Sequence, residues 1–492
     1  MKGIASAALK NLRRPDLIEH RAFLGGVWVE RSERLSVIDP AGGDHLVDVT
    51  ACSLDDVDSA IEAASAAFLH WRETLPVERG DILRSWGRLM RDNARDLATI
   101  ISAEQGKPLE ESLGEISYAA NFLDWFASEG ERSYGETIPS HLKGGNLSVR
   151  MQPIGVTAAI TPWNFPSAMI ARKAGAALAA GCTMIVKPAP ETPLSALALA
   201  KLAEEAGMPA GVLQVLPGEA APLARRLLEH TDVRAFSFTG STEVGRLLLT
   251  QSAATVKKAS LELGGHAPFI VFGDSDLSQA VAGCISAKFA TSGQDCLAAN
   301  RIYVQRALYD RFIDRFADAT SRLTVGHGLE PGIDIGPMTR PSVAEKCRQQ
   351  IAQALSAGAR LVCGGQDSPL GGNFVTPTVL ADVTDDMLIA REETFGPVAA
   401  ILPFDDENEV VRRANATEMG LAAYVYTNDL GRAMRLTDQL EYGMVAVNTS
   451  KFTGAPIPFG GWKQSGLGRE GSRHGLMEYL EPKYVCFGNL AA

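Results

Sequence analysis

The stretch ATSGQDCLAAN, residues 290–300, places a cysteine, Cys296, where a loop is expected. Gly293 and Gln294 interrupt the helix-like run that precedes it, and a glycine at such a boundary usually marks a turn. Residues that do chemistry concentrate on loops. A cysteine in this place is a small buried hydrophobe, half of a disulfide, a metal ligand or a nucleophile.

The other cysteines narrow this choice. The chain has seven, an odd number, and they are scattered with no Cys-x-x-Cys pair: Cys52, Cys182, Cys284, Cys296, Cys347, Cys363 and Cys486. A disulfide framework is not expected in so long a chain, and no nearby histidines give zinc-binding spacing, so we expect no metal site. Cys296 is therefore either a buried filler residue or a nucleophile.

Composition excludes several classes of partner. The 492 residues are 46% hydrophobic and 21% charged, which is typical of a soluble globular protein with two or three domains. The net charge is −11 and no basic block occurs, so nucleic-acid binding is not expected. The longest apolar run, residues 174–186, is too short to span a membrane, and the N-terminus is a poor secretion signal. We therefore expect a cytoplasmic protein that binds neither nucleic acid nor membrane.

The elements that must position Cys296 begin with an alternating series. From residue 155, β-rich runs (155–162, 183–189, 212–218, 233–240, 257–265) alternate with helical runs (168–181, 194–207, 221–230, 242–253). This alternation predicts βαβ units and a parallel sheet. Ligands of such sheets bind beyond the carboxyl ends of the strands. The motifs PWN, KPAP, TGSTEVG and ELGG stand just after four of these predicted strands.

A second alternating series starts at Pro268 and predicts a second α/β domain. Residues 133–153 are different, because LKGGNLSVRM puts Gly-Gly-Asn between two alternating runs and predicts a hairpin. The C-terminal EYLEPKYVCFGNL has a similar β character. We expect both segments to be edge strands that pair with another subunit.

No G-x-G-x-x-G follows an early strand, so a phosphate site must use another turn. Gly240 and Ser241 lie between a predicted strand and a predicted helix that carries Gly245. Such a turn presents free N–H groups to a phosphate, or it serves only as a Ser/Thr helix cap. Lys187 in KPAP likewise either meets a ribose or phosphate or is a surface lysine.

Seven motifs occur in one order along the chain: ITPWNFP, VKPAPETP, FTGSTEVG, LELGG, GQDC, EETFGP and PFGGWKQSGLGREG. Together they resemble the NAD(P)-dependent aldehyde dehydrogenase superfamily over nearly the whole chain, and residues 163–183 and 466–488 look most like succinate-semialdehyde dehydrogenases. The resemblance implies an α/β fold in three parts. These are a Rossmann-like cofactor domain (1–131 and 154–262), an α/β catalytic domain (263–470) and a small β bridging and oligomerisation element (132–153 and 471–492), in a homodimer or homotetramer.

The resemblance also implies roles for catalytic residues. Cys296 matches the family nucleophile, Glu262 the general base and Asn164 the oxyanion-hole amide. Lys173 and Glu470 match an inner pair linked to proton movement near the base. These residue types suit aldehyde oxidation, which needs a sulfur nucleophile, donors for an oxyanion and a base that activates water against a thioester.

A second set of positions matches the cofactor site: Ile160, Thr161, Pro162, Trp163, Lys187, Pro190, Gly240, Ser241, Gly245, Leu263, Glu393 and Phe395. The implied cofactor is NAD or NADP. In the family, NAD-preferring members often carry a glutamate where this chain has Pro190, with Glu191 displaced by one residue. The main barrier to NADP is therefore absent, and we expect use of either cofactor.

The substrate is less defined. Arg172 matches an arginine that succinate-semialdehyde dehydrogenases use for the substrate carboxylate, although it is otherwise a solvated helix charge. A second arginine and a second cysteine that such enzymes often carry are Ala290 and Ala298 here. Lys451 lies in the family's substrate-loop region and is the other candidate for charge. We expect succinate semialdehyde or a related semialdehyde, with a bulkier, aromatic or long-chain aldehyde as the alternative.

Two other functional classes among the relatives of such enzymes are alternatives for this sequence. One is a catalytically silent relative that serves as a binding protein, which the presence of Asn164, Glu262 and Cys296 disfavours. The other is the group of relatives that pass the thioester to coenzyme A, in which the glutamate is often missing. Glu262 therefore favours hydrolysis to the free acid.

Overall fold

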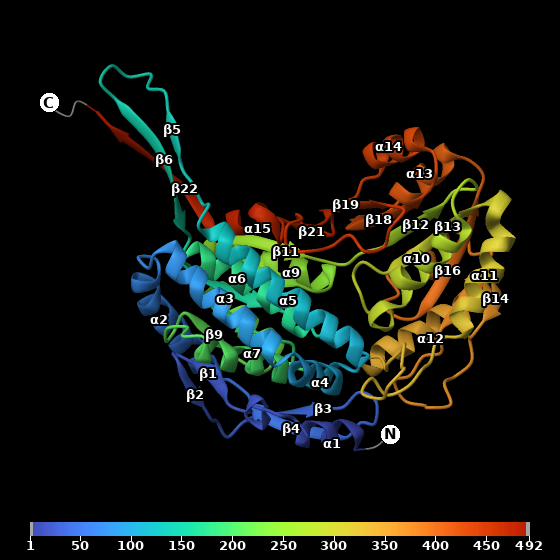
Figure 1. The fold of residues 1–492 in the computed structure, drawn as a ribbon, viewed down its shortest axis with the longest axis horizontal. Helices are drawn as coiled ribbons and strands as arrows, with labels where there is room; N and C mark the ends of the chain where they lie inside the picture. Colours follow the sequence, from blue (N-terminus) through green and yellow to red (C-terminus); the bar gives the residue numbers. More distant parts are fainter. Residues whose placement is uncertain (1–2, 489–492) are drawn as a thin grey trace.

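A computed structural model describes residues 3–488 and has two large sheets, each flanked by helices, a third sheet of three strands and two further sheets of two strands each (Figure 1). The first large sheet has eight strands. In spatial order they are β2 (Val27–Val29), β1 (Ala22–Leu24), β9 (Leu213–Val215), β8 (Thr183–Lys187), β7 (Val156–Ile160), β10 (Val233–Thr239), β11 (Lys258–Glu262) and β21 (Gly466–Leu467). From β9 to β11 all neighbours are parallel, which confirms the predicted parallel sheet.

Helices connect these strands as the sequence pattern predicts. They are α6 (Pro166–Ala180), α7 (Pro193–Glu205), α8 (Ala220–Glu229) and α9 (Thr242–Ser252). Gly181 and Gly207, just beyond the ends of α6 and α7, have φ of +95° and +90°. Glycine adopts this left-handed conformation without the cost that a side chain would add, which is why the two helices stop there.

The N-terminal helices cover the first sheet. They are α2 (Leu54–Trp71), α3 (Pro76–Asp92), α4 (Ala94–Gln105) and α5 (Leu109–Gly130). α3 and α5 pack on α6, so that every residue of α6 is buried, including Arg172 and Lys173. A helix that is buried all round can carry charges only if they are paired inside the protein.

The second large sheet forms the other α/β unit. Its strands, in spatial order, are β14 (Arg360–Cys363), β15 (Thr378–Ala381), β16 (Val398–Phe404), β13 (Ala299–Gln305), β12 (Ala267–Val271), β18 (Ala422–Tyr426) and β19 (Met444–Val447). Its helices are α10 (Leu277–Phe289), α11 (Tyr309–Ser321), α12 (Pro341–Ser356), α13 (Glu407–Asn415) and α14 (Leu430–Gln439). All strand pairs except β14–β15 are parallel. The sequence pattern does not predict β15 or α12.

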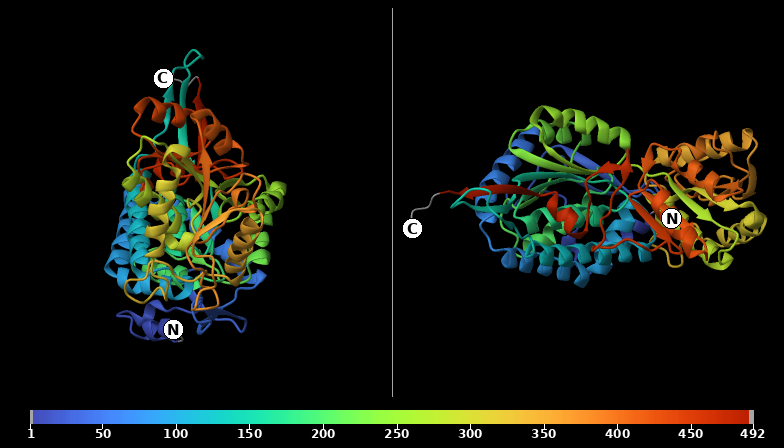
Figure 2. Two further views of the ribbon diagram at one scale, coloured as in Figure 1. Left: turned by 90° about the vertical axis from the view of Figure 1, so that its right-hand side faces the viewer. Right: turned by 90° about the horizontal axis from the view of Figure 1, so that it is seen from above.

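The third sheet projects from the body of the molecule (Figures 1 and 2). β5 (Glu136–Ile138) and β6 (Asn146–Pro153) form the predicted hairpin, and β22 (Leu480–Phe487) pairs with β6 along its whole length. The expectation that both segments are edge strands is wrong for β6, because the C-terminal strand of the same chain covers it. Residues 1–2 and 489–492, which belong to the expected first and last segments, lie outside the described residues.

The segment after β19 crosses back to the first sheet. β21 pairs antiparallel with β11, Phe459 forms a bridge with Glu470, and α15 (Ser472–Met477) packs on α5 and α6. This return brings Glu470 into the interior beside α6. Across residues 3–488, no helix is long and apolar enough to cross a membrane.

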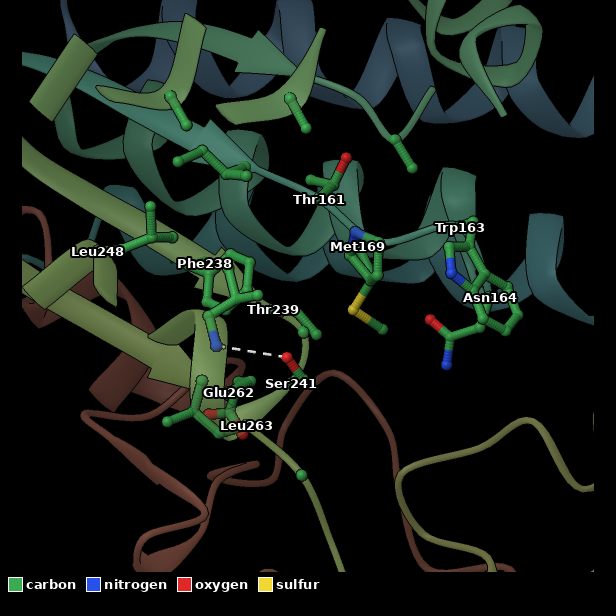
Figure 3. A pocket seen from close by; sticks show the side chains of 18 of the residues that line it. Thr161, Trp163, Asn164, Met169, Phe238, Thr239, Ser241, Leu248, Glu262 and Leu263 are labelled. Carbon is green, nitrogen blue, oxygen red and sulfur yellow. Dashed lines mark hydrogen bonds between the residues drawn. The ribbon is translucent and has the colours of Figure 1, made fainter. Parts of the chain in front are cut away.

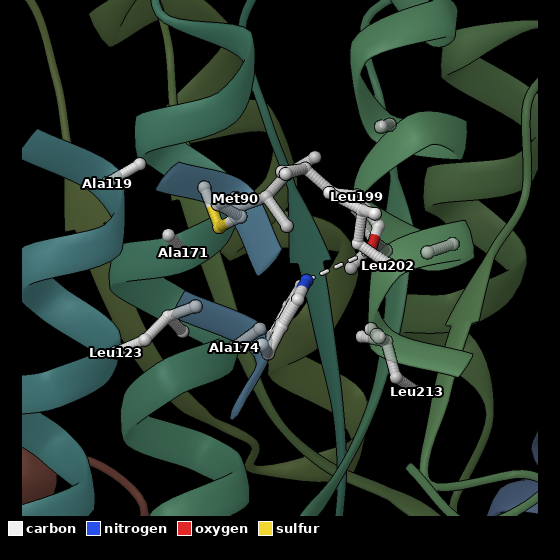
Figure 4. Close-up of a cluster of buried hydrophobic side chains, with 14 of the residues drawn as sticks. Met90, Ala119, Leu123, Ala171, Ala174, Leu199, Leu202 and Leu213 are labelled. Atoms are coloured by element: carbon white, nitrogen blue, oxygen red, sulfur yellow. Dashed lines mark hydrogen bonds between the residues drawn. The ribbon is translucent and has the colours of Figure 1, made fainter. Parts of the chain in front are cut away.

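The core behind the first sheet is filled by side chains from four helices, among them Met90, Leu123, Ala174 and Leu199 (Figure 4). Trp86 of α3 lies in the same core with 0% exposure, and its Nε1 donates a hydrogen bond to Leu199 O at 3.0 Å. Large aromatic residues in such places contribute strongly to stability because no other side chain fills the space they leave.

We expect Trp86→Ala to lower the free energy of unfolding by about 3–5 kcal/mol, since it removes a fully buried indole. Trp462→Ala is the control, because Trp462 is 49% exposed and should change stability by no more than about 0.5 kcal/mol. Urea unfolding followed by circular dichroism measures both, and equal midpoints for the two variants would contradict the assignment of Trp86 to the core.

Candidate active site

The carboxyl ends of the parallel strands of the first sheet open onto a cavity of about 530 Å³. Figure 3 shows part of its lining, with Trp163 and Asn164 from the β7–α6 loop and Glu262 and Leu263 from the end of β11. Most of the residues singled out from the sequence line this cavity: Ile160, Thr161, Pro162, Trp163, Asn164, Arg172, Lys187, Pro190, Gly240, Ser241, Glu262, Leu263, Cys296, Glu393 and Phe395.

Four other residues that were singled out from the sequence do not line the cavity. Lys173 and Glu470 are buried behind its wall. Gly245 lies one turn into α9, where a Cβ would come within 2.5 Å of the Leu263 side chain. The glycine therefore lets α9 pack closely against the end of β11. Lys451 is exposed on the loop after β19.

Other lining residues were not predicted. Met169 and Phe459 add apolar surface near Arg172, and Val244 and Leu247 of α9 add more at the other end. Leu247 is 51% exposed, so an apolar residue on the outer face of a helix was the available signal for this part of the site. Arg340, just before α12, carries no such signal.

Cys296 lies in a turn between a 3₁₀ segment (Ala290–Gly293) and β13, as predicted for a loop. Its carbonyl packs directly on Gly265, where any side chain would overlap it, so the glycines of ELGG let the β11–β12 connection approach the cysteine. Burial, together with Asp295 and Glu393, raises the pKa of the Cys296 thiol well above its usual value. The thiol is therefore protonated at neutral pH and must lose its proton before it reacts.

Asn164 lies on the β7–α6 loop and lines the same cavity as Cys296. Its side-chain amide Nδ2 donates to Gln294 O at 3.0 Å, two residues before the cysteine. An amide donor held beside a thiol can stabilise negative charge on an oxygen of a group bound to the sulfur.

Glu262 is the last residue of β11. Its side chain is buried and lines the cavity. Neither carboxyl oxygen has a hydrogen-bond partner among the described residues. Burial and the neighbouring Glu470 raise the pKa of Glu262 well above its ordinary value. A buried carboxyl group that lacks a partner and lines a cavity is suited to taking a proton from water.

Three buried charges lie behind Glu262. The Lys173 ammonium contacts Glu470 directly and donates to Thr239 Oγ1 at 2.7 Å, while Arg172 Nη2 lies 2.7 Å from Glu470 Oε2. Burial alone would raise the pKa of Glu470, but Lys173 and Arg172 outweigh it, so that pKa lies below its usual value. Glu470 therefore stays ionised and holds both cations, and Glu262 is left free.

The other half of the cavity carries groups suited to a dinucleotide. Ser241 caps α9 by accepting a hydrogen bond from Val244 N, which places a helix N-terminus at the cavity wall. Lys187 is buried, and its only side-chain hydrogen bond within residues 3–488 goes to Pro188 O at 2.8 Å. Burial lowers the pKa of Lys187 to about 8. An unpaired buried cation beside a helix N-terminus fits the anionic and hydroxyl groups of a nucleotide.

Two further groups lie between these halves. Glu393 Oε1 accepts from Gly265 N at 3.1 Å, and burial raises the pKa of Glu393 to about 7. Phe395 and Trp163 meet edge to face with ring centroids 5.5 Å apart. Both aromatic rings and the carboxyl group line the passage toward Cys296 and fit a sugar and a flat ring.

An amide donor and an unpartnered carboxyl group at the carboxyl ends of parallel strands, with a thiol on a loop that lines the same cavity, are typical of an α/β dinucleotide-dependent enzyme that works through a cysteine. Comparison with known proteins agrees. The model of the aldehyde dehydrogenase family matches residues 28–485. The chain is 52% identical to the NADP(+) succinate-semialdehyde dehydrogenase GabD of Escherichia coli K12, over 97% of the chain and 99% of GabD.

Two other proteins are similar over nearly the whole chain. The 3-sulfolactaldehyde dehydrogenase of Pseudomonas putida is 52% identical over 97% of this chain and 99% of its own. The NAD+ complex of the aldehyde dehydrogenase of Bacillus cereus superposes with a TM-score of 0.94 at 36% identity, covering 99% of each chain. The protein belongs to the aldehyde dehydrogenase family, and the fold predicted from its motifs is confirmed.

The charge balance behind Glu262 leads to a prediction for Glu470→Gln. The variant leaves Arg172 and Lys173 buried without their shared counter-ion, which should cost about 3–5 kcal/mol of unfolding free energy. It also removes a carboxylate that raises the pKa of Glu262 and leaves the cations that lower it. Since a carboxylate base works only above its pKa, the acid limb of aldehyde turnover should move to lower pH.

Ser237→Ala is the matched control for this variant. Ser237 Oγ donates to the same Glu470 carboxylate at 3.3 Å but carries no charge. The acid limb of the pH–rate profile of Ser237→Ala should therefore stay close to that of the unaltered protein. Rate profiles against pH and denaturant unfolding check both variants. An acid limb that moves to higher pH in Glu470→Gln would contradict this charge balance.

Proposed function

We propose that the protein oxidises an aldehyde to a carboxylic acid with NAD or NADP, through a thioester on Cys296 that is hydrolysed by water activated by Glu262. The observation that carries the proposal is the arrangement of Cys296, Asn164 and the unpartnered Glu262 around one cavity whose other half fits a dinucleotide. The family membership supports the same reaction.

In the first half of the reaction, the Cys296 thiol releases its proton to solvent, and the thiolate attacks the aldehyde carbon. A C–S bond forms, the C=O π bond breaks and the carbonyl oxygen becomes an oxyanion. The Asn164 amide and the Cys296 backbone N–H donate hydrogen bonds to that oxygen. Each such donor is worth about 10²–10³ in rate. The bound dinucleotide supplies the acceptor for the hydride that leaves this carbon, and a thioester remains on Cys296.

In the second half, Glu262 takes a proton from a water molecule as its oxygen attacks the thioester carbon. The C–S bond then breaks, the sulfur leaves as a thiolate and the product is a carboxylic acid. The raised pKa of Glu262 suits this role, because a base is most effective when its pKa lies near the working pH.

The cofactor would be held by Lys187, the N-terminus of α9 at Ser241, Glu393 and Phe395. At the adenosine end the acidic Glu191 is paired with Arg340 at 2.6 Å, while Pro190 lines the cavity. A carboxylate neutralised in this way repels a 2′-phosphate less than a free one does. This pairing supports use of NADP as well as NAD, and the E. coli relative carries NADP(+) in its name.

We propose succinate semialdehyde or a related semialdehyde as the substrate. Arg172 lines the cavity, and its Nε has no hydrogen-bond partner among the described residues. Glu470 neutralises the arginine only in part, because the same carboxylate also serves Lys173. The names of both relatives above are those of aldehydes that also bear an acid group.

We also propose that the chain forms a homodimer or homotetramer through the projecting three-stranded sheet. The free edges of β5 and β22 and the exposed Tyr134, Tyr484 and Phe487 support this, since unpaired strand edges and exposed aromatic side chains favour pairing with another chain. On this view residues 132–153 and 471–492 join subunits, residues 1–131 and 154–262 bind the cofactor, and residues 263–470 carry the nucleophile.

The two halves of the reaction can be separated by Glu262→Gln. Acylation precedes the step that needs Glu262, so this variant should give a burst of NADH close to one per site and then turn over about 10²-fold or more slowly. Cys296→Ala should give neither burst nor turnover while still binding the dinucleotide. Stopped-flow absorbance at 340 nm and a dinucleotide titration measure these outcomes. A Glu262→Gln variant without a burst would assign this residue to an earlier step.

Arg172→Leu tests the substrate class. A charge-assisted bond to a carboxylate contributes about 1.5–3 kcal/mol, so kcat/KM for succinate semialdehyde should fall about 10- to 150-fold more than kcat/KM for butanal. Lys173→Met is the matched control. This substitution removes the other partner of Glu470 from the same helix. Because Lys173 does not line the cavity, the substitution should lower kcat/KM equally for the two substrates.

The assay uses a panel of charged and neutral aldehydes, each with NAD and with NADP. Equal losses for succinate semialdehyde and butanal in Arg172→Leu would remove the semialdehyde assignment and leave a general aldehyde dehydrogenase. A requirement for added coenzyme A would overturn the hydrolytic step instead.

A further inference from the structure

The two donors proposed for the oxyanion come from different sheets. Asn164 follows β7 of the eight-stranded sheet, and Cys296 precedes β13 of the seven-stranded sheet. One hydrogen bond, from Asn164 Nδ2 to Gln294 O at 3.0 Å, joins the two loops directly. Because a misplacement of about 1 Å can cost about 10²-fold in rate, the spacing of the donors needs further support.

The loop of Asn164 is held by a buried ion pair. Lys107 Nζ donates to Asn164 O at 2.5 Å and to Glu115 Oε2 at 2.8 Å. The other carboxylate oxygen, Glu115 Oε1, accepts from the N–H groups of Ser167 and Ala168 at 2.8 and 3.1 Å. One ion pair therefore fixes the asparagine backbone and the first turn of the helix that follows it.

The loop of Cys296 is held from the same segment. Glu111 Oε2 accepts from Thr291 N at 2.8 Å, where the backbone has a φ of +50°. Gln105 exchanges hydrogen bonds with the Thr339 hydroxyl at 3.1 and 2.7 Å, and Thr339 N donates to Gln294 Oε1 at 2.9 Å. A non-glycine residue keeps a positive φ only where its surroundings enforce it, and Glu111 supplies part of that enforcement.

These four residues, Gln105, Lys107, Glu111 and Glu115, form what we call the α4–α5 clamp. They occupy one short segment, residues 105–115, and they touch both loops. The side chains of Lys107 and Glu115 are 0% and 1% exposed, and none of the four lines the cavity. A buried ion pair adds little net stability, so we infer that the Lys107–Glu115 pair serves mainly to fix the geometry of the groups it contacts.

We propose that the α4–α5 clamp positions the two oxyanion donors, and that Lys107, Glu115 and Glu111 are positioning residues for the acyl-transfer chemistry of Cys296. The inference rests on the proposed function, because the oxyanion is the one formed at Cys296. The clamp acts through Asn164 and the Cys296 loop and makes no contact with substrate.

The test uses acylation of Cys296 by p-nitrophenyl acetate without dinucleotide, since a thiol attacking this ester needs the same oxyanion donors but no hydride acceptor. Lys107→Met is made in the unaltered protein and in Asn164→Ala, which gives a double-mutant cycle. The rate of the nitrophenolate burst is the readout, and Cys296→Ala sets the background.

We expect Lys107→Met to slow the burst about 10- to 100-fold in the unaltered protein and no more than about twofold in Asn164→Ala, because its effect passes through the missing amide. Glu115→Gln should behave in the same sense with a smaller loss, since it keeps an acceptor for the helix N–H groups. Glu111→Gln should slow the burst in both backgrounds, because it acts on the Cys296 side. These two variants test the clamp if Lys107→Met does not fold.

Arg79→Met is the matched structural control. Arg79 of α3 is also a buried cation, but it holds the opposite end of α6, where it donates to Ala179 O at 3.1 Å. It should destabilise the protein without changing the burst rate more than about twofold in either background. Thermal unfolding of every variant records the structural loss separately.

The proposal is overturned if Lys107→Met and Asn164→Ala slow the burst independently, so that their factors multiply, or if Arg79→Met slows it as much as Lys107→Met does. Aldehyde oxidation is assayed on the same preparations. A coupled cycle in a protein that oxidises no aldehyde would leave the clamp standing and overturn the proposed function. Independent factors in an active dehydrogenase would do the reverse.

Discussion

The pairing of one carboxylate with two cations inside the protein is the interaction on which the site depends. Glu470 pairs with both Lys173 and Arg172, so these charges can lie on a fully buried helix, and no residue within 3–488 hydrogen-bonds the Glu262 carboxyl group. If either cation paired with Glu262 instead, its pKa would fall and it would be a poorer base. The buried cluster of Glu470, Lys173 and Arg172 therefore keeps the nearby Glu262 carboxyl group free of an ion pair.

The residues around the cavity arrive from far apart in the chain, and each comes from the end of a regular element. Asn164 follows β7, Glu262 ends β11, Cys296 precedes β13, and Glu470 reaches the interior through the antiparallel return of β21. The N-terminal helices contribute no residue to the cavity, yet α5 buries α6, and residues 105–115 contact both catalytic loops. Rigid strands and helices set the geometry, and loops present the groups.

The sequence predicted the elements and the motif residues well because both are local signals. Alternating β-rich and helical runs marked β7 to β11, glycines marked the ends of α6 and α7, and the motifs after the strands marked part of the cavity lining. Long-range pairing was not predictable in the same way. Nothing near Lys107 or Glu115 indicates that they meet Asn164, the sequence did not show that β22 would cover β6, and the place of Glu191 opposite Arg340 depends on how the sheets pack.

The order of the charged residues along the chain has a consequence for biosynthesis. Arg172 and Lys173 leave the ribosome long before Glu470, which is among the last of 492 residues. Nascent chains fold from the N-terminus as units, but two buried cations without a counter-ion oppose closure of α6 against its neighbours. The first large sheet must therefore wait, incompletely packed, for a residue made near the end of translation. We therefore expect a nascent chain that stops before Glu470 to be an incompletely packed intermediate that exposes apolar surface to chaperones and proteases, rather than a smaller enzyme.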